Sequence, residues 1–437
     1  MTFFANIFKP KTTEVQPKIQ MGRYEPIYFD SPHQDLWNQA TSAFAARQYL
    51  KAYTHLLDYL KNKDNDNVAY VTKKGILKFR ILQGSTTVYG YCDYRKMIVS
   101  APIVQLTSSS SEFLQSLLRS NYYFQFCKYS IDDKDQVTLV FDTFVEDGSP
   151  QKVLAALTEL ALEADKKDDI WLSQYEGLSK VKRNDMQVVN ERIGKIMTQF
   201  VQSSYQNAIN ELKSNPYYHD YPGAVSYILL GLLYKLDFLV KPEGKMMEVI
   251  NEAQSLFFDS TADTVESKNS KIMNLIEYLA SMTYADFKVE LYHTTVTFSP
   301  NQARSHRRWT DIIIAQNNDL KWYENQGRDA IVIAICDYIV GFSLYNYTLS
   351  DPLKPLLKLY YEVMETEYFA ALGYDYKYIL KGELNKSNIL KALTQIIKKF
   401  KTNHPNLDLN SKLLRFDSKA QFAKSYLMML EQMDGIE

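Results

Sequence analysis

The feature that most constrains the fold is an alternation of apolar and polar residues in the stretch 66–144. Leu77, Phe79 and Ile81 alternate with Lys78 and Arg80. This period of two is typical of a strand that buries one face. The same alternation recurs at two later places, namely Met97, Val99 and Ala101, and then Val137, Leu139 and Phe141. The stretch therefore predicts a sheet with one face against a hydrophobic core.

The residues of this stretch divide into three strand-forming segments, a helix and two more strands. The three segments are NVAYVTKKG, then ILKFRILQGSTTVYGYCDY with a turn at Gly84-Ser85, and then RKMIVSAPIVQL. The serine run 108–111 predicts the helix, because Ser109 as N-cap and Glu112 three residues later form a capping-box pattern. The two later strands are predicted over 123–130 and 136–141.

A long helix is predicted on each side of this block. Ser31 is a typical N-cap and Pro32 a typical first helical residue, and the periodic apolar residues after them predict a first helix over about 32–61. Ser149 and Pro150 start the second helix in the same way, and it continues to about 165. The predicted order in an α+β domain at 31–170 is helix, three strands, helix, two strands, helix.

This order of elements resembles the small α+β fold of type III secretion chaperones and their YbjN-like relatives. The resemblance covers roughly 32–170 and depends on element order. It implies a non-catalytic protein-binding module, often dimeric, that holds an extended segment of a partner along its sheet and helices. The family has no fixed catalytic residues to carry over. Secretion chaperones are usually short and acidic, whereas this chain has a formal charge of -1 over 437 residues and a long extension.

The extension, residues 184–437, is predicted to be an all-helical domain. Proline-containing turns separate segments of helical periodicity, which we place at about 184–213, 221–238, 242–258, 263–290, 325–346, 353–371, 386–402 and 411–434. No 34-residue recurrence typical of a tetratricopeptide array is found, although stacked helix pairs stay an alternative. Residues 1–30 are predicted to form an extended arm, and the domain boundary is expected within 165–185.

Composition favours some classes of protein over others. Lys+Arg 50 against Asp+Glu 51 gives no basic excess for nucleic acid. The start, MTFFANIFKPKTTE, does not resemble a secretory signal, and three scattered cysteines suggest no disulfide framework. The longest apolar run, 331–342, is shorter than the roughly 20 residues of a membrane span and contains Asp337, so we expect a buried core helix. We therefore expect a cytoplasmic protein without a membrane span.

The sequence contains none of the familiar motifs of enzyme or cofactor sites. Neither G-x-x-x-x-G-K-[ST] nor G-x-G-x-x-G is present, and the six histidines are spread along the chain. There is no G-x-S-x-G motif. Cys92, Cys127 and Cys336 lie in predicted strands or in the apolar helix, where thiols usually act as small hydrophobic groups. We predict no catalytic residues, no metal ligands and no cofactor.

One basic and aromatic cluster is a candidate partner- or anion-binding site. It consists of Arg304, His306, Arg307, Arg308 and Trp309. Arginine offers planar bidentate donors and stacks on aromatic rings, so the cluster could bind an acidic peptide or a phosphate. In the alternative, these residues belong to a loop that starts at Ser299-Pro300, and their charges are solvated.

Two functional hypotheses follow from these observations. The first is a non-catalytic protein-binding protein, chaperone-like or scaffold-like, that binds a protein partner; a homodimer is a further expectation. The alternative is an enzyme or small-molecule-binding protein with a site between helices of the C-terminal domain. A broad exposed aromatic or apolar surface favours the first hypothesis. A deep pocket with converging polar groups favours the second. The 33 tyrosines reflect either compositional bias or a tyrosine-rich contact surface.

Overall fold

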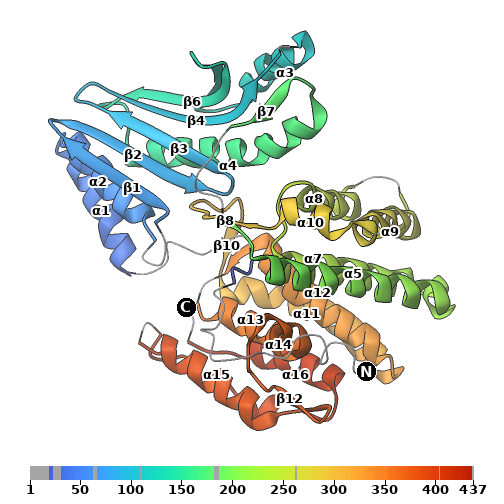
Figure 1. Ribbon diagram of the computed structural model, residues 1–437. Helices are drawn as coiled ribbons and strands as arrows, with labels where there is room; N and C mark the ends of the chain where they lie inside the picture. Colours follow the sequence, from blue (N-terminus) through green and yellow to red (C-terminus); the bar gives the residue numbers. More distant parts are fainter. Residues whose placement is uncertain are drawn as a thin grey trace. The chain divides into compact units, whose positions relative to one another are not determined.

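The computed structural model describes residues 19–22, 31–62, 66–108, 110–181, 187–260, 263–349, 351–402 and 404–435. The chain forms two compact units, an α+β unit of Tyr24–Val188 with Tyr292–Pro300, and a helical unit of Met1–Arg23, Val189–Leu291 and Asn301–Glu437 (Figure 1). The predicted α+β class is thus confirmed. Most of the predicted arm, 1–30, lies outside the described residues. In its described part, the Gly22 backbone N–H donates to the Phe238 carbonyl at 2.8 Å.

The α+β unit is built on an antiparallel sheet with the strand order β1-β2-β3-β4-β6-β5, and β7 pairs with the end of β4. Four strands, not three, precede the helix at 111–121, because the segment 76–92 forms two strands on either side of the turn at Gly84-Ser85. The strands are β1 (Val68–Lys73), β2 (Ile76–Gln83), β3 (Thr86–Cys92), β4 (Lys96–Leu106), β5 (Lys128–Ile131), β6 (Gln136–Phe144) and β7 (Leu178–Lys180).

A two-residue turn sets the register of the first hairpin. Lys74 and Gly75 both have positive φ, 52° and 74°, as the tight hairpin turns that match strand twist require. The turn places Lys73 opposite Ile76 and Val71 opposite Lys78. Because strand side chains alternate between faces, this register decides which residues point away from the core.

Helices cover one face of this sheet. They are α1 (Ser31–Ala45), α2 (Tyr49–Leu60) and α4 (Pro150–Gln174), which lie on the same side of the sheet in Figure 1. The predicted helix at 32–61 is interrupted at Arg47, whose φ of 59° is incompatible with a continuous helix. Tyr53 of α2 donates to the carbonyls of Val145 and Gly148 at 2.8 and 2.9 Å. This contact anchors α2 beside the start of α4.

Two predicted boundaries in this unit were wrong for identifiable reasons. The cap of α3 (Ser111–Asn121) is Ser110, whose Oγ accepts from the Phe113 amide at 3.0 Å, and Ser109 lies outside the described residues. The predicted strand at 123–130 starts only at Lys128. The amides of Gln125, Phe126 and Cys127 donate to the Glu159 carboxylate at 2.8–3.0 Å instead of to a neighbouring strand.

The α+β unit also contains a segment from far downstream, Tyr292–Pro300, which we call the inserted segment. Its Thr297 and Phe298 amides donate to Gln83 Oε1 at 3.1 and 2.8 Å, and Gln83 Nε2 donates to the Phe298 carbonyl at 3.2 Å. The Phe298 ring is buried in the core of this unit. The first two residues of the inserted segment form β9 (Tyr292–His293), which pairs with β8 (Gln187–Val188). The sequence pattern predicts this segment as part of an all-helical domain at 184–437, whereas the structure groups it with the α+β unit.

The helical unit contains the predicted helices, some of them divided, and two helices that were not predicted, at 217–220 and 306–325. Its helices are α5 (Glu191–Ser214), α6 (Tyr217–Asp220), α7 (Pro222–Val240), α8 (Gly244–Phe258), α9 (Val265–Ser281), α10 (Tyr284–Glu290), α11 (His306–Asn325), α12 (Asp329–Asn346), α13 (Leu353–Met364), α14 (Thr366–Leu372), α15 (Lys386–Phe400), the 3-10 turn η1 (Ser411–Leu413) and α16 (Lys419–Glu431). Short strand pairs accompany them: β10 (Gln302–Arg304) with β11 (Tyr347–Leu349), and β12 (Ile379–Leu380) with β13 (Glu383–Leu384).

The predicted helix at 263–290 is divided in two. Thr283 forms a capping box with Asp286, which starts α10 as a separate helix. The predicted helix at 353–371 is likewise divided, at Glu365. The segment at 411–434 is helical only from Lys419. Helix α11 was not predicted at all.

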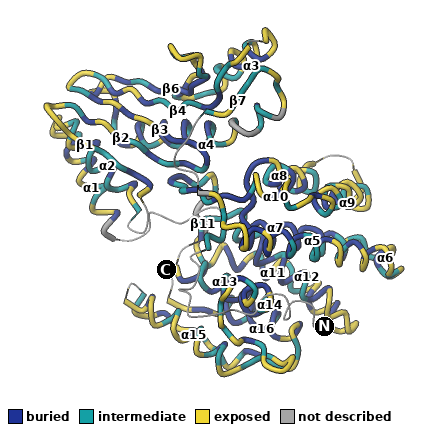
Figure 2. Tube along the Cα trace, in the orientation of Figure 1, coloured by how far each residue is buried: buried dark blue, intermediate teal, exposed yellow. Residues whose placement is uncertain are grey.

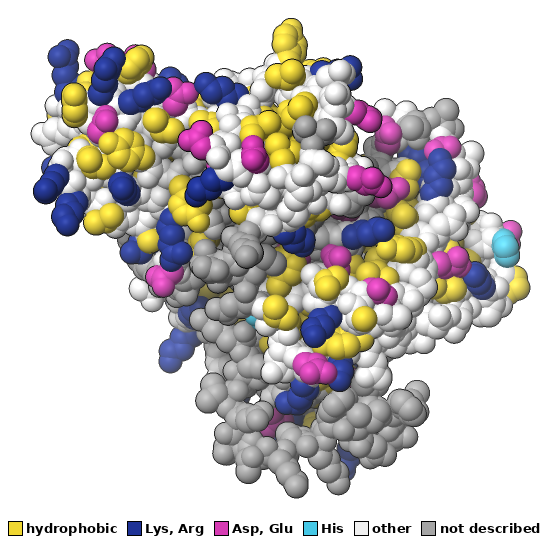
Figure 3. All heavy atoms as spheres, turned by 45° about the horizontal axis from the view of Figure 1, so that its top comes forward, with side chains coloured by type: hydrophobic (Ala, Val, Ile, Leu, Met, Phe, Trp, Pro, Cys, Tyr) yellow, Lys and Arg dark blue, Asp and Glu magenta, His cyan; other side chains and the backbone are white. Residues whose placement is uncertain are grey.

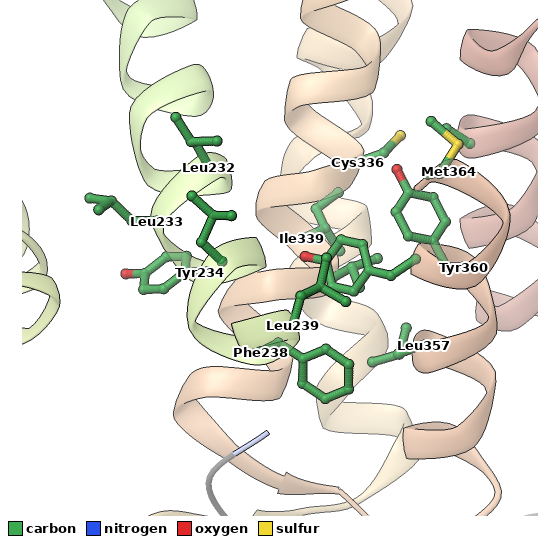
Figure 4. Packing of buried hydrophobic residues seen from close by; sticks show 14 of the residues in the cluster. Leu232, Leu233, Tyr234, Phe238, Leu239, Cys336, Ile339, Leu357, Tyr360 and Met364 are labelled. Carbon is green, nitrogen blue, oxygen red and sulfur yellow. The ribbon is translucent and has the colours of Figure 1, made fainter. Parts of the chain in front are cut away.

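Helices α7 and α12 pack closely against each other in the core of the helical unit. A Cβ at Gly341 would lie 2.6 Å from the Tyr234 Cβ, so glycine permits this approach. Side chains from α7, α12 and α13 meet in this core, among them Leu239, Ile339 and Leu357 (Figure 4). The tube in Figure 2 shows buried residues concentrated along these helices.

Two helices of the described chain pass a length and composition test for membrane spans. They are α7 and α12. The most apolar 18-residue stretch of α7 has a mean hydropathy of 1.6 and is 67% buried, and that of α12 has a mean hydropathy of 1.4 and is 50% buried. The expected core placement of the apolar run 331–342 is confirmed, because Ile335, Cys336 and Ile339 are fully buried in the helical unit.

Candidate functional site

The sheet of the α+β unit has a second face, opposite α1, α2 and α4, which we call the outer face. One row of paired residues crosses five neighbouring strands there: Val71, Lys78, Tyr91, Ile98 and Asp142. A second row runs beside it and contains Ala69, Arg80, Tyr89, Ser100, Val140 and Lys128. Their neighbours along each strand, such as Leu77, Phe79 and Val99, are buried in the core on the other face.

The outer face exposes large apolar side chains. The exposed fractions are 57% for Val71, 51% for Tyr89, 36% for Tyr91, 41% for Ile98 and 46% for Phe144. Single exposed apolar residues are ordinary on protein surfaces, whereas a contiguous group indicates an interaction site. Because the register places these residues on adjacent strands, they form such a group.

The charges on the outer face are mostly positive. Its cations are Lys73, Lys78, Arg80, Lys96 and Lys128, and among the described strand residues Asp142 is the acidic side chain that alternation places on this face. Lys96 and Lys128 pair with Asp142 at 2.6 and 3.2 Å. Hydrogen bonds from Lys96 and then Lys128 lower the pKa of Asp142, so its carboxylate is ionised at neutral pH.

The space-filling view agrees with this description. Hydrophobic and basic side chains, with several acidic ones among them, lie over the upper left of Figure 3, on the α+β unit. At one end of this surface the Arg95 guanidinium lies 5.9 Å from the Phe144 ring centroid, a cation–π contact. The outer face is thus an aromatic and basic surface.

The structure places the predicted basic cluster at the start of α11 and separates its members. Ser305 caps the helix by accepting from the Arg308 amide. Arg307 and Arg308 are exposed. Trp309 is buried, and its Nε1 donates to Ser343 Oγ at 2.8 Å. The Trp309 ring therefore belongs to the core and is not available to stack on a ligand that the arginines bind. The backbone of Arg304 is in β10, and its side chain lies outside what the structure describes.

His306 and Arg307 line a hollow of about 600 Å³ in the helical unit. His306 Nε2 lies 2.8 Å from the Leu430 carbonyl, which indicates that this nitrogen carries the proton. The remaining walls carry two acidic side chains, Glu431 and Asp434, together with uncharged polar and apolar groups: Thr310, His404, Pro405, Asn406, Gln432, Met433 and Gly435. The hollow thus joins two members of the predicted cluster to polar groups from distant parts of the chain.

Among the residues that the structure describes, the histidines, acids and cysteines form no metal-binding group. Within the described ranges, no group of three or more His, Cys, Asp or Glu residues could hold a metal ion. Cys92, Cys127 and Cys336 are buried free thiols, as predicted. Burial raises the pKa of the Cys92 thiol to about 12, which leaves it protonated and unreactive at neutral pH.

Comparisons with known proteins add no family assignment. No family model matches the chain, and no curated protein is significantly similar to it.

Proposed function

We propose that this chain is a non-catalytic protein-binding protein that holds an extended segment of a partner on the outer face of its sheet. The observation that carries the proposal is the contiguous exposed group of Val71, Tyr89, Tyr91 and Ile98 on adjacent strands. Tyrosine supplies large contact area with little loss of conformational entropy, which suits it to protein contacts.

The dimensions of the outer face suit a short extended segment. The row from Val71 to Asp142 crosses four inter-strand steps of about 4.8 Å each, or about 19 Å in all. That span equals about six residues of extended chain at about 3.3 Å per residue. A segment of this length can place alternate side chains against Tyr91 and Ile98.

Site-specific photo-crosslinking tests the proposal in the full chain. A benzophenone amino acid replaces Tyr91 on the outer face, and in a matched control it replaces Tyr122, which is 87% exposed but lies beyond α3. We expect position 91 to capture one protein in the producing cells and position 122 to capture none. Equal capture at both positions, or none at position 91, would contradict the proposal, since the control is the more accessible site.

A further inference from the structure

Cations and tyrosines lie side by side at the centre of the outer face. Lys78 of β2 is directly opposite Tyr91 of β3, and Arg80 is directly opposite Tyr89. Directly opposed residues have Cβ atoms about 4.5–5.5 Å apart. A ligand that covers either tyrosine therefore also meets a basic side chain from the neighbouring strand.

We propose that the partner segment is acidic, with apolar side chains on Tyr89, Tyr91 and Ile98 and carboxylates directed toward Lys78 and Arg80. This inference rests on the proposed function of the outer face and names the chemistry of its partner. Carboxylates reach these cations without leaving the tyrosine rings, because the cations flank the rings on the next strand.

Charge balance on the outer face supports an acidic partner. Asp142 is paired within the protein to Lys96 and Lys128, so its charge is neutralised locally. Lys73 and Lys78 are exposed on the β1–β2 side of the face, away from Asp142. An acidic segment meets a positive potential there, and a basic segment is repelled.

The same features favour a polypeptide over single-stranded nucleic acid. The bases of a single strand stack on aromatic rings, and its phosphates require cations. Neither group makes use of exposed aliphatic side chains such as Val71 and Ile98. An apolar and acidic polypeptide satisfies the rings, the aliphatic groups and the cations together.

Fluorescence anisotropy with the full chain tests the inference. The probes are a labelled twelve-residue peptide of alternating Glu or Asp and Val or Phe, its Gln and Asn analogue, and a twelve-nucleotide oligothymidine. The test variant is Lys78→Glu with Arg80→Glu. Its matched control is Lys51→Glu with Lys61→Glu, which changes the net charge equally at exposed positions on and just after α2, on the opposite side of the sheet.

We expect the acidic peptide to bind about tenfold more tightly than its neutral analogue. The affinity of the test variant for the acidic peptide should be lower than that of the wild type by about the same factor. The control variant should bind this peptide as tightly as the wild type does. Equal binding of both peptides, unchanged by Lys78→Glu with Arg80→Glu, would overturn the inference and leave the proposed function in place if position 91 still crosslinks. Tighter binding of oligothymidine that depends on Lys78 and Arg80 would overturn both, as would absence of peptide binding together with no crosslink at position 91.

Discussion

Asp337 lies in the most apolar run of the chain, and its surroundings explain how a carboxylate is accommodated there. Lys235 of α7 lies 3.0 Å from Asp337 Oδ2 and 2.6 Å from Glu365 Oε1. The Tyr360 hydroxyl donates to Asp337 Oδ1 at 2.9 Å. A buried charge that has an ion-pair partner and hydrogen bonds is tolerated, but removal of one partner leaves the other uncompensated.

We therefore predict that Lys235→Met strongly destabilises the protein. The substitution leaves Asp337 and Glu365 close together without a cation, and such changes cost about 3–5 kcal/mol. Chemical denaturation followed by circular dichroism measures the loss. The control is Lys213→Met, which removes an exposed pair with Glu277 and should cost about 0–1 kcal/mol. Equal effects of the two substitutions would contradict this account of the core.

The stability of Lys235→Met should also depend on pH. Burial raises the pKa of Asp337 in the folded protein, against the opposing effect of Lys235. For an acid with a raised folded pKa, the stabilisation is complete below the unfolded pKa of about 3.9 and is lost as pH rises through the folded pKa. In Lys235→Met no cation offsets the cost of ionising the buried Asp337 carboxyl as the pH rises. The difference in unfolding free energy between wild type and variant should thus be smaller at pH 5 than at pH 8, and a constant difference would refute the prediction.

At the scale of elements, the inserted segment completes the core of the α+β unit. Phe298 is 4% exposed, and Thr297 Oγ1 donates to the Leu82 carbonyl at 2.7 Å. Asn67 Nδ2 also lies 3.1 Å from Thr297 Oγ1. The ends of β1 and β2 therefore depend on a segment more than 200 residues away in sequence.

Phe298→Ala should loosen β2 specifically. Removing a buried phenylalanine costs about 3–5 kcal/mol, and hydrogen exchange followed by mass spectrometry should show faster exchange in the peptide covering Ile76–Gln83. Phe258→Ala is the control, because Phe258 is half exposed on α8 in the helical unit. Unchanged exchange in β2 would show that the inserted segment does not support the sheet.

At the scale of the whole molecule, the sequence predicted what has a local periodic pattern. The sheet residues such as Leu77, Phe79 and Ile81 alternate, and Ser149-Pro150 starts α4 as expected. Helix α11 was missed because its first turn, His306–Arg308, is basic, and polar residues separate its buried Ile313 and Leu320. The contact between Gln83 and Phe298 joins residues 215 positions apart, and no local pattern records it.

The outer face was also beyond the sequence analysis. Tyr89, Tyr91 and Ile98 occupy positions of the alternating pattern where polar residues are expected. Apolar residues at such positions are exposed, and this could have indicated a contact surface. Their assembly into one surface depends on which strands are neighbours, and this strand order is not visible in the sequence. For the basic cluster, the sequence showed residue types but not that Trp309 points into the core.

The central claim is that the outer face binds a protein partner, and an affinity comparison tests it most directly. The partner captured at position 91 is titrated by calorimetry against the full-length wild type, Tyr89→Ser with Tyr91→Ser, and the exposed control Tyr122→Ser with Tyr123→Ser. We predict at least a tenfold loss of affinity for the outer-face variant, an unchanged affinity for the control, and similar unfolding temperatures for all three. An affinity of the outer-face variant equal to that of the wild type would contradict the claim.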